Sequence, residues 1–261
     1  MDERYSRYPI TKVSRGVVEE LEDPVITEYP FTINFNGEEM VTLLCTPEHL
    51  EELAVGFLAS EGLLRNRSQL QRTHLDVEKG LIDVEAEGQH NVARQLFLKR
   101  YITTGCGKGT SFYSGMDSSL IKPVESQLQI KAEDIFALMK QLQDRSELYR
   151  TTGGVHSAAL ATTDEMLIFR EDVGRHNAVD KLFGRCFLEQ LNLEDKILLT
   201  SGRISSEILL KMAKRGIAVL VSRSAPTDLA VRLADQLGIT LIGFVRGSRM
   251  NIYTHRHKVT E

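Results

Sequence analysis

The chain has 261 residues, of which 42% are hydrophobic and 26% charged, and its formal net charge is -4. This is enough for a full core in one large domain or two modest ones. The net negative charge excludes a general nucleic-acid coat or a polybasic membrane surface, since either needs a face rich in Lys and Arg. No run approaches the roughly 20 apolar residues of a spanning helix, and the charged N-terminus has no apolar signal-peptide core. We therefore expect a cytoplasmic protein that binds neither nucleic acid nor membrane.

Residues 1–120 predict a small α+β domain. Two β-rich runs flank Asn36-Gly37, a dipeptide suited to the positive φ angles of a tight hairpin turn. The stretch "TPEHLEELAVGFLASEGLL" predicts a helix over about residues 47–60, with Thr46 as its cap. A second hairpin is expected to turn at Lys79-Gly80, and "VARQLFLKRYITT" predicts a further strand.

A second domain is predicted over residues 128–261. Periodicity lapses around residues 117–130, where Pro123 interrupts, and this indicates a boundary. The polar stretch "AEDIFALMKQLQDRSELYR" predicts a helix, and the small residues of "TTGGVHSAALA" suggest the start of a tightly packed helix. Short apolar strands then alternate with helices, in the order "EMLIFRED", "HNAVDKLFGRCFLEQL", "KILLTSG", "SSEILLKMAKRG", "IAVLVSRS", "PTDLAVRLADQLG" and "ITLIGFVRG". This alternation predicts a mainly parallel sheet covered on both faces, a three-layer α/β/α domain.

Polar clusters follow four successive predicted strands. They are Gly174-Arg175-His176, Ser201-Gly202-Arg203, Ser222-Arg223-Ser224 and Arg246-Gly247-Ser248-Arg249. Ligands of open α/β sheets bind beyond the carboxyl ends of strands, and guanidinium groups and backbone amides suit phosphate oxygens. One such cluster could be an ordinary turn, because turns are rich in Gly and Ser. Four clusters at one predicted edge favour a phosphate-bearing ligand. No G-x-G-x-x-G follows a strand, so a nicotinamide or flavin fingerprint is missing.

Two histidines could carry chemistry. His176 could act as a base or a phosphate donor, or simply cap a helix. His156 could be a zinc ligand, but a zinc deaminase would need a glutamate two residues later and a downstream P-C-x-x-C pair. Neither is present, so we expect no metal site.

The three cysteines differ in their surroundings. They are far apart, and no C-x-x-C pair suggests a metal site or a disulfide framework. Cys45 ends an apolar strand and Cys186 lies on a helical apolar stripe, so both are expected in the core. Cys106 lies in "TTGCGKGTS", where glycines favour access and Lys108 favours the thiolate. This stretch does not fit a phosphate-binding P-loop, and Cys106 could be a nucleophile or a sulfur carrier.

Several motifs resemble those of one known family. In order they are "CTPEHLEELAVGFLASEGLL", "TTGGVHSAALA", "REDVGRHNAVDKL", "SGRISSE", "SAPTDLAV" and "GFVRGSRMNIYTH". Together they closely resemble the FdhD/NarQ family of formate dehydrogenase accessory sulfurtransferases. The resemblance runs from about Asn34 to His255, nearly the whole chain.

The resemblance implies a cytoplasmic sulfurtransferase that receives sulfur from a cysteine desulfurase as a persulfide on Cys106. It implies transfer of that sulfur to the molybdenum cofactor, Mo-bis(molybdopterin guanine dinucleotide), which formate dehydrogenase needs. It also implies that the second domain has a cytidine deaminase-like fold without zinc, and a homodimer is expected. The cofactor-binding segment of the family corresponds to Phe244, Val245, Arg246, Gly247, Ser248 and Arg249. Further candidates for cofactor binding are Arg175, His176, Ser201, Arg203 and Ser222.

The chain departs from the family pattern in one respect. Better-known members carry C-x-x-C in the loop that matches "TTGCGKG", whereas this loop has only Cys106. A persulfide on Cys106 therefore cannot be discharged by an intraloop disulfide. One alternative is a chaperone that only binds and delivers the cofactor. Another is a nucleotide hydrolase with His176 as base, although no acidic pair for magnesium is evident.

Overall fold

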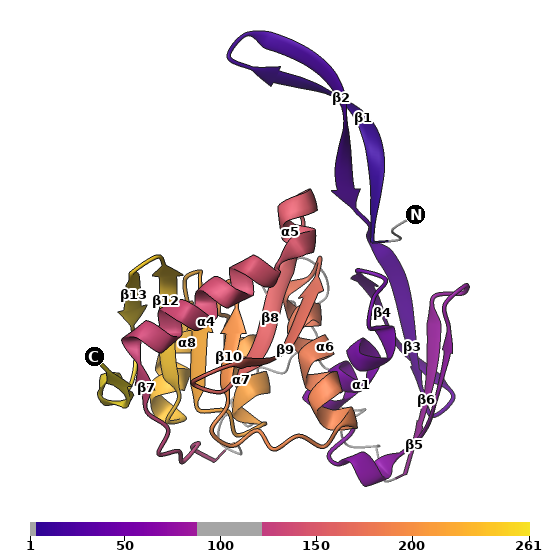
Figure 1. Cartoon of the computed structure of the whole chain (residues 1–261). Coiled ribbons are helices and arrows are strands. Elements are labelled where there is room, and N and C mark those ends of the chain that lie inside the picture. Colours follow the sequence, from indigo (N-terminus) through magenta and orange to yellow (C-terminus); the bar gives the residue numbers. More distant parts are fainter. Residues whose placement is uncertain (1–3, 88–121) are drawn as a thin grey trace.

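The computed structural model describes residues 4–87 and 122–261. Within these ranges a two-stranded ribbon precedes a small sheet with one helix, and a larger sheet lies between helices (Figure 1). The chain is thus of the predicted α/β class, with a smaller α+β part at its N-terminal end. The proposed division of the chain between residues 120 and 128 stays a prediction, because residues 88–121 lie outside the described ranges. No helix of the described part is both long and apolar enough to cross a bilayer.

The ribbon consists of β1 (Tyr5–Ser14) and β2 (Val17–Ile26), which are antiparallel and fully paired. The two residues between them, Arg15 and Gly16, have φ angles of 49° and 82°, as the tightest hairpin turns require. The ribbon projects away from the rest of the chain (Figure 1). The ribbon was not predicted from the sequence.

The small sheet has the order β4-β3-β6-β5 and contains both predicted hairpins. Its strands are β3 (Tyr29–Phe35), β4 (Glu38–Cys45), β5 (Leu70–Asp76) and β6 (Leu81–Ala86). Asn36 and Gly37 have φ angles of 50° and 81°, which confirms the predicted turn. A short 3-10 helix, η1 (Arg67–Gln69), leads into β5.

Helix α1 (Leu50–Ser60) packs on this sheet and begins three residues later than predicted. The prediction that Thr46 caps it is wrong. The Thr46 hydroxyl accepts a hydrogen bond from the Val173 amide at 3.1 Å, and its own amide donates to Asp172 at 3.0 Å. Both groups are thus engaged by a segment more than 120 residues further along the chain.

The large sheet has six strands in the order β13-β12-β11-β10-β8-β9. They are β8 (His156–Ala161), β9 (Met166–Asp172), β10 (Ile197–Thr200), β11 (Val219–Ser222), β12 (Thr240–Arg246) and β13 (Arg249–Ile252). The prediction of a helix in "HSAALA" is wrong, since this segment is β8. A strand buried on both faces needs small apolar side chains as much as a packed helix does, and periodicity alone does not separate the two.

The large sheet is mixed, so the prediction of a mainly parallel sheet is also wrong. Only β10–β11 and β11–β12 are parallel pairs, and the pairs β8–β9, β8–β10 and β12–β13 are antiparallel. The links from β8 to β9 and from β12 to β13 are a few residues long. A parallel crossover needs a dozen or more residues, so these links force hairpins.

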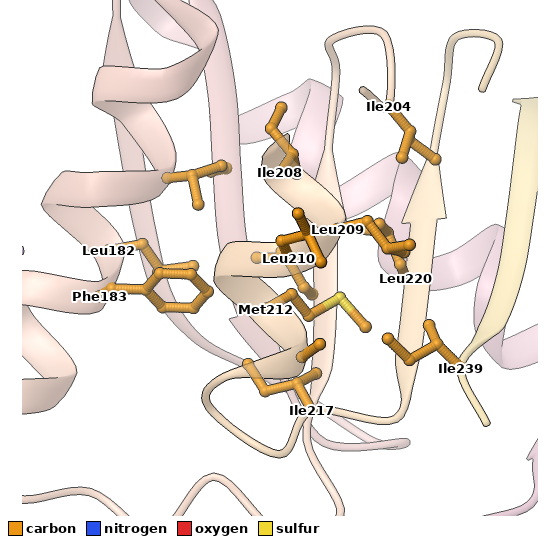
Figure 2. Packing of buried hydrophobic residues seen from close by; sticks show 14 of the residues in the cluster. Leu182, Phe183, Ile204, Ile208, Leu209, Leu210, Met212, Ile217, Leu220 and Ile239 are labelled. Atoms are coloured by element: carbon orange, nitrogen blue, oxygen red, sulfur yellow. The ribbon is translucent and has the colours of Figure 1, made fainter. Parts of the chain in front are cut away.

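Helices cover both faces of the large sheet, which confirms the predicted three layers (Figure 1). The helices are α4 (Ala132–Arg145), α5 (Glu147–Thr152), α6 (Arg175–Leu188), α7 (Ser206–Ala213) and α8 (Asp228–Gln236). One face packs against α6, α7 and α8, where side chains such as Leu182, Ile208 and Leu220 are buried (Figure 2). The other packs against α4. The chain ends with η2 (Arg256–Lys258) and β14 (Val259–Thr260), which pairs in parallel with β7 (Ile130–Lys131).

The small part joins the large one where α1 lies against α6 (Figure 1). Two glycines allow the contact. A Cβ on Gly56 would lie 1.8 Å from the Asp180 carbonyl oxygen, and a Cβ on Gly184 would lie 1.8 Å from the Glu52 carbonyl oxygen. Each helix backbone thus packs directly on the other, and no larger residue fits at either position.

Gly56→Ala is expected to lower the free energy of unfolding by about 3 kcal/mol, because backbone atoms would have to move apart. The midpoint of thermal unfolding should fall by roughly 6 °C. Gly62→Ala is the control: Gly62 has a φ of 77° and nothing within 4 Å of an added Cβ, so it tests backbone strain without a clash. Gly62→Ala should lower the free energy of unfolding by about 1 kcal/mol. Equal losses in the two variants would contradict close packing of α1 on α6.

Candidate functional site

Four strands of the large sheet end at the same edge, as the sequence predicted. β10, β11 and β12 are mutually parallel, and β9 runs the same way because β8 is antiparallel to both β9 and β10. His156 begins β8 and therefore lies at this edge too. We call the segments 174–176, 201–203, 222–224 and 244–249, together with His156, the strand-end rim.

The loops of the strand-end rim are bonded to one another. The Ser222 hydroxyl donates to the Gly202 carbonyl at 2.7 Å and accepts from the Ser224 amide at 2.9 Å. The Phe244 amide in turn donates to the Ser224 carbonyl at 3.1 Å. Ser222 is fully buried, so its hydroxyl holds adjacent loops together. Its role toward a ligand stays a prediction.

Ser201 has a similar position on the next strand. Its hydroxyl accepts a hydrogen bond from the Ser157 amide at 2.9 Å, and its own amide donates to the Ser157 carbonyl at 3.0 Å. These bonds extend the pairing of β8 with β10 to the end of the sheet. Arg203, two residues later, is exposed at the rim.

Arg175 and His176 form the first turn of α6, which follows the edge strand β9, and they reach the segment after β10. A Cβ added at Gly202 would lie 3.1 Å from the Arg175 Cβ and 3.4 Å from His156 Nδ1, so this glycine lets the three residues meet. His176 Nε2 lies 2.9 Å from Glu207 Oε2 and 3.4 Å from the Ser205 hydroxyl, both at the start of α7. The structure thus brings Arg175, His176 and the segment of Ser201 and Arg203 together.

The environment of His156 keeps its imidazole neutral. Burial lowers its pKa below the ordinary value of 6.5, and the positive charge of Arg175 and the neighbouring His176 lower it further. The carboxylate of Asp172 acts weakly in the opposite sense. A neutral imidazole can donate one hydrogen bond and accept another, which suits it to a polar ligand at the rim.

The segment of Phe244 to Arg249 is the tip of the β12–β13 hairpin. Arg246 and Arg249 are paired across a two-residue turn and both are exposed. Phe244 has a φ of 54° at an irregularity in the pairing, its side chain is 38% exposed, and the next residue, Val245, is buried. The hairpin therefore offers two guanidinium groups and one aromatic side chain to solvent at the end of the rim.

Distance across the sheet decides which candidates can act together. Four strand intervals separate β12 from β9. At about 4.8 Å per interval, the Arg246 hairpin and the β9–α6 turn are roughly 19 Å apart. The segments of Ser201 and Ser222 fill the space between them. An extended ligand could contact the whole rim, whereas one phosphate could contact only a part.

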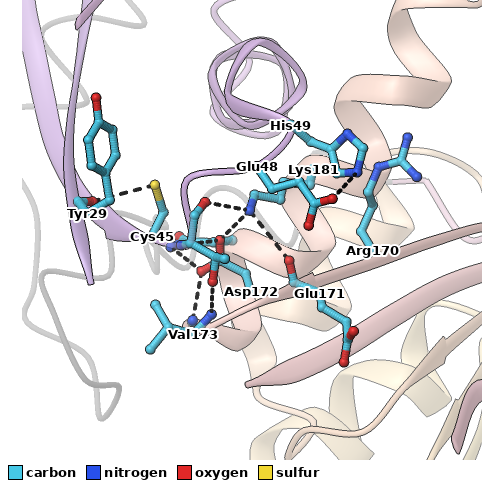
Figure 3. A network of polar contacts seen from close by, with 12 residues as sticks. Tyr29, Cys45, Glu48, His49, Arg170, Glu171, Asp172, Val173 and Lys181 are labelled. Atoms are coloured by element: carbon cyan, nitrogen blue, oxygen red, sulfur yellow. Dashed lines mark hydrogen bonds and ion pairs between the residues drawn. The ribbon is translucent and has the colours of Figure 1, made fainter. Parts of the chain in front are cut away.

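A buried polar network fixes the β9–α6 turn (Figure 3). Asp172 Oδ1 accepts from the Gly174 amide at 2.8 Å and from Asn177 Nδ2 at 3.0 Å. Asp172 Oδ2 lies 2.6 Å from Lys181 Nζ and accepts from the Thr46 amide at 3.0 Å. Asp172 and Lys181 are both fully buried. This carboxylate therefore fixes the start of α6, and with it Arg175 and His176, against the small N-terminal part.

Sequence reasoning missed this network. Asp172 and Lys181 lie in "REDVGRHNAVDKL" and Glu207 in "SGRISSE", but none of them was predicted to have a role. The contact of Asp172 with Thr46 spans 126 residues. His156 was considered only as a zinc ligand. In the described ranges no three His, Cys, Asp or Glu side chains are grouped as metal ligands would be.

The two described cysteines are buried, as predicted. Cys45 is 0% and Cys186 is 3% exposed. Burial raises the pKa of each thiol to about 12, and for Cys45 the charge of Asp172 adds to the effect. At neutral pH neither is a thiolate nucleophile. Cys106 lies outside the described residues.

The depressed pKa of His156 predicts a pH effect on stability. In the unfolded chain this histidine takes up a proton near pH 6.5, whereas in the folded protein it does so only at lower pH, so unfolding is favoured as the pH falls through this interval. Denaturant unfolding of His156→Gln between about pH 7 and 5 should show a smaller loss of stability than the wild type. His74→Gln, at an exposed position of β5, should keep the wild-type profile. Identical profiles for wild type and His156→Gln would contradict the assignment.

Comparison with known proteins finds one family that shares both the sequence motifs and the fold of this chain. A family model described as the FdhD/NarQ family matches residues 26–260. A sulfur carrier protein FdhD from Geobacillus kaustophilus is 48% identical, covering 97% of this chain and 96% of that protein. Its namesake from Bacillus subtilis is 45% identical with the same coverage. A crystal structure of a candidate formate dehydrogenase accessory protein from Desulfotalea psychrophila has a TM-score of 0.80 at 24% identity, covering 98% of this chain and 99% of that one, and shows the same fold. The chain therefore belongs to the FdhD/NarQ family.

Proposed function

We propose that this protein is a cytoplasmic sulfur carrier that moves persulfide sulfur from a cysteine desulfurase to the molybdenum cofactor of formate dehydrogenase. Relatives nearly half identical over almost the whole chain are named as sulfur carriers. The observation that carries the proposal is the burial of Cys45 and Cys186, whose thiols have pKa values of about 12. Cys106 is the remaining cysteine of the chain. We assign it as the sulfur-carrying residue.

The first transfer step needs no external oxidant. The Cys106 thiolate attacks the terminal sulfur of the desulfurase persulfide, a new S–S bond forms, and the old S–S bond breaks. The desulfurase cysteine leaves as a thiolate, and Cys106 carries the persulfide with its proton. Lys108, two residues along the chain, favours the thiolate that this step consumes. Since the chain has no C-x-x-C pair, the sulfur leaves to the acceptor and not through a disulfide within the loop.

The acceptor, Mo-bis(molybdopterin guanine dinucleotide), is a substrate of this reaction. We propose that its phosphates bind at the strand-end rim, mainly to Arg246 and Arg249. Both side chains are exposed at the tip of a hairpin, and the segment resembles the cofactor-binding segment of the family. The remainder of the rim is formed or supported by Arg175, His176, Ser201, Arg203 and Ser222. Its length of roughly 19 Å suits a dinucleotide better than a single phosphate.

A cofactor chaperone without sulfur transfer would use the same rim but not the thiol. Both alternatives require a supply of cofactor to formate dehydrogenase. They differ in two respects: whether a persulfide forms on Cys106, and whether removal of the Cys106 thiol abolishes the supply of active cofactor to formate dehydrogenase.

Incubation of the protein with a cysteine desulfurase and cysteine should add the mass of one sulfur atom to the peptide that contains Cys106. Cys106→Ala should carry no added sulfur and should leave formate dehydrogenase inactive in a strain without a wild-type copy. Cys186→Ala is the control; it removes a buried thiol, lowers stability by about 1 kcal/mol and keeps sulfur loading. Full formate dehydrogenase activity with Cys106→Ala would contradict sulfur transfer and favour the chaperone.

Binding of a guanine nucleotide should depend on the β12–β13 hairpin. Arg246→Ala and Arg249→Ala should each weaken the Kd for GDP about tenfold, because each removes a charge-assisted hydrogen bond worth roughly 1.5 kcal/mol. Calorimetric titration measures this, and Lys140→Ala on the exposed side of α4 is the charge-matched control. An unchanged Kd in both arginine variants would place the phosphates elsewhere.

A further inference from the structure

The ring of His156 is a polar group of the strand-end rim that has no hydrogen-bond partner within residues 4–87 and 122–261. His156 begins β8, which lies between β9 and β10 in the large sheet, and its side chain is partly buried. Burial of an unpaired polar group takes it from water without a compensating hydrogen bond. The two ring nitrogens are therefore available to a ligand that binds at the rim.

The charges around His156 decide which kind of ligand group it suits. Arg175 and His176 act on it from α6 and Asp172 acts from the end of β9, and the net effect with burial is a lowered pKa and a neutral ring. A contact with a phosphate would instead favour the imidazolium. Guanidinium groups bind anionic oxygens, whereas a neutral imidazole offers one donor and one acceptor. His156 thus suits an uncharged N–H or C=O group.

The position of His156 in the sheet separates it from the proposed phosphate contacts. Three strand intervals lie between β12 and β8, which is roughly 14 Å at about 4.8 Å per interval. A ligand with its phosphates on Arg246 and Arg249 therefore reaches His156 only with a part remote from those phosphates. In a molybdopterin guanine dinucleotide the remote parts include the guanine and the pterin ring. Both rings carry an amino group, a ring N–H and a carbonyl oxygen side by side, and we call either one an amino-oxo ring.

The backbone around His156 holds its ring in place before a ligand binds. The next residue, Ser157, exchanges two hydrogen bonds with Ser201, so the start of β8 cannot move away from β10. A Cβ on Gly202 would lie 3.1 Å from the Arg175 Cβ and 3.4 Å from His156 Nδ1, so the bare glycine leaves space between these two side chains. A ring that is fixed in advance lowers the entropy cost of binding.

We propose that His156 is a specificity-determining residue that hydrogen-bonds the amino-oxo ring of the ligand, an assignment that rests on the proposed function for the position of the phosphates. The rim then has two tasks at two places. The arginines of the β12–β13 hairpin bind charge, which many anions share. His156 recognises the ring, which distinguishes a pterin or guanine compound from other diphosphates.

Calorimetric titration with three diphosphates tests this assignment. GDP carries guanine, hydroxymethylpterin diphosphate carries pterin, and inorganic diphosphate has no ring. His156→Phe keeps an aromatic ring and removes both nitrogens. It should raise the Kd of at least one ring-bearing diphosphate about fivefold, the effect of one neutral hydrogen bond, and leave the Kd of inorganic diphosphate unchanged. An effect on GDP identifies guanine as the contact, and an effect on the pterin compound identifies pterin.

Two further variants complete the design. His156→Gln keeps a neutral donor and acceptor and should weaken binding less than His156→Phe does. His74→Phe makes the same substitution at an exposed position of β5 and should leave all three Kd values unchanged. Arg246→Ala should weaken all three diphosphates. If Arg246→Ala has no effect, the inference fails together with the proposed phosphate site; if it weakens all three while His156→Phe weakens none, the inference alone fails.

A measurement on the wild type covers the case in which His156→Phe folds poorly. Magnetic resonance spectra that correlate the ring protons with the ring nitrogens should show a shift at His156 on addition of a ring-bearing diphosphate and none with inorganic diphosphate. Equal shifts with all three ligands, or an equal loss of affinity for all three in His156→Phe, would overturn the assignment, because neither result depends on the ring.

Discussion

The buried pair of Asp172 and Lys181 is the constraint on which the rest of the structure depends. Both residues are fully buried, and an isolated charge at such a place would be strongly destabilising. Each charge therefore needs the hydrogen-bond and ion-pair partners that surround it. These partners come from two directions: the Thr46 backbone from the small N-terminal part, and Gly174 and Asn177 from the start of α6. One ion pair thus ties the small part, the end of β9 and the start of α6 into a single arrangement.

Neighbouring polar contacts extend the contact between the small N-terminal part and the large part along α6. Asp180 bonds Lys211 at 2.5 Å and the Ser60 hydroxyl at 2.8 Å, and Glu52 forms two hydrogen bonds with Arg170 at 2.5 and 2.7 Å. Between these polar contacts the backbones of α1 and α6 pack on each other through Gly56 and Gly184. Helices this close leave little freedom to slide. The first turn of α6, with Arg175 and His176, is therefore presented to the rim by a rigid support.

The rim itself is held by its own hydrogen bonds. Ser201 and Ser222 use their hydroxyls on neighbouring backbone groups, so the loops after β10 and β11 keep their shape without a ligand. This preorganisation lowers the entropy cost of binding. A rim that is fixed at one end by the Asp172 network and ends in the exposed Arg246 hairpin suits the proposed role of holding a long, charged substrate.

The sequence by itself determined most of the local elements and the burial of two thiols. Alternating apolar runs and turn residues predicted both hairpins of the small sheet, the strands β9 to β12 and the helices α6 to α8, because these depend on periodicity and turn geometry within a few residues. The β1–β2 ribbon and β13 were not predicted. Apolar surroundings likewise marked Cys45 and Cys186 as core residues. Only the tertiary structure decided that "HSAALA" is a strand, that the sheet is mixed, and that Thr46 bonds Asp172 and Val173 and does not cap a helix. Each of these features depends on which distant segment packs beside the residues concerned. A contact such as that of Thr46 with Asp172, 126 residues apart, leaves no periodic pattern in the sequence.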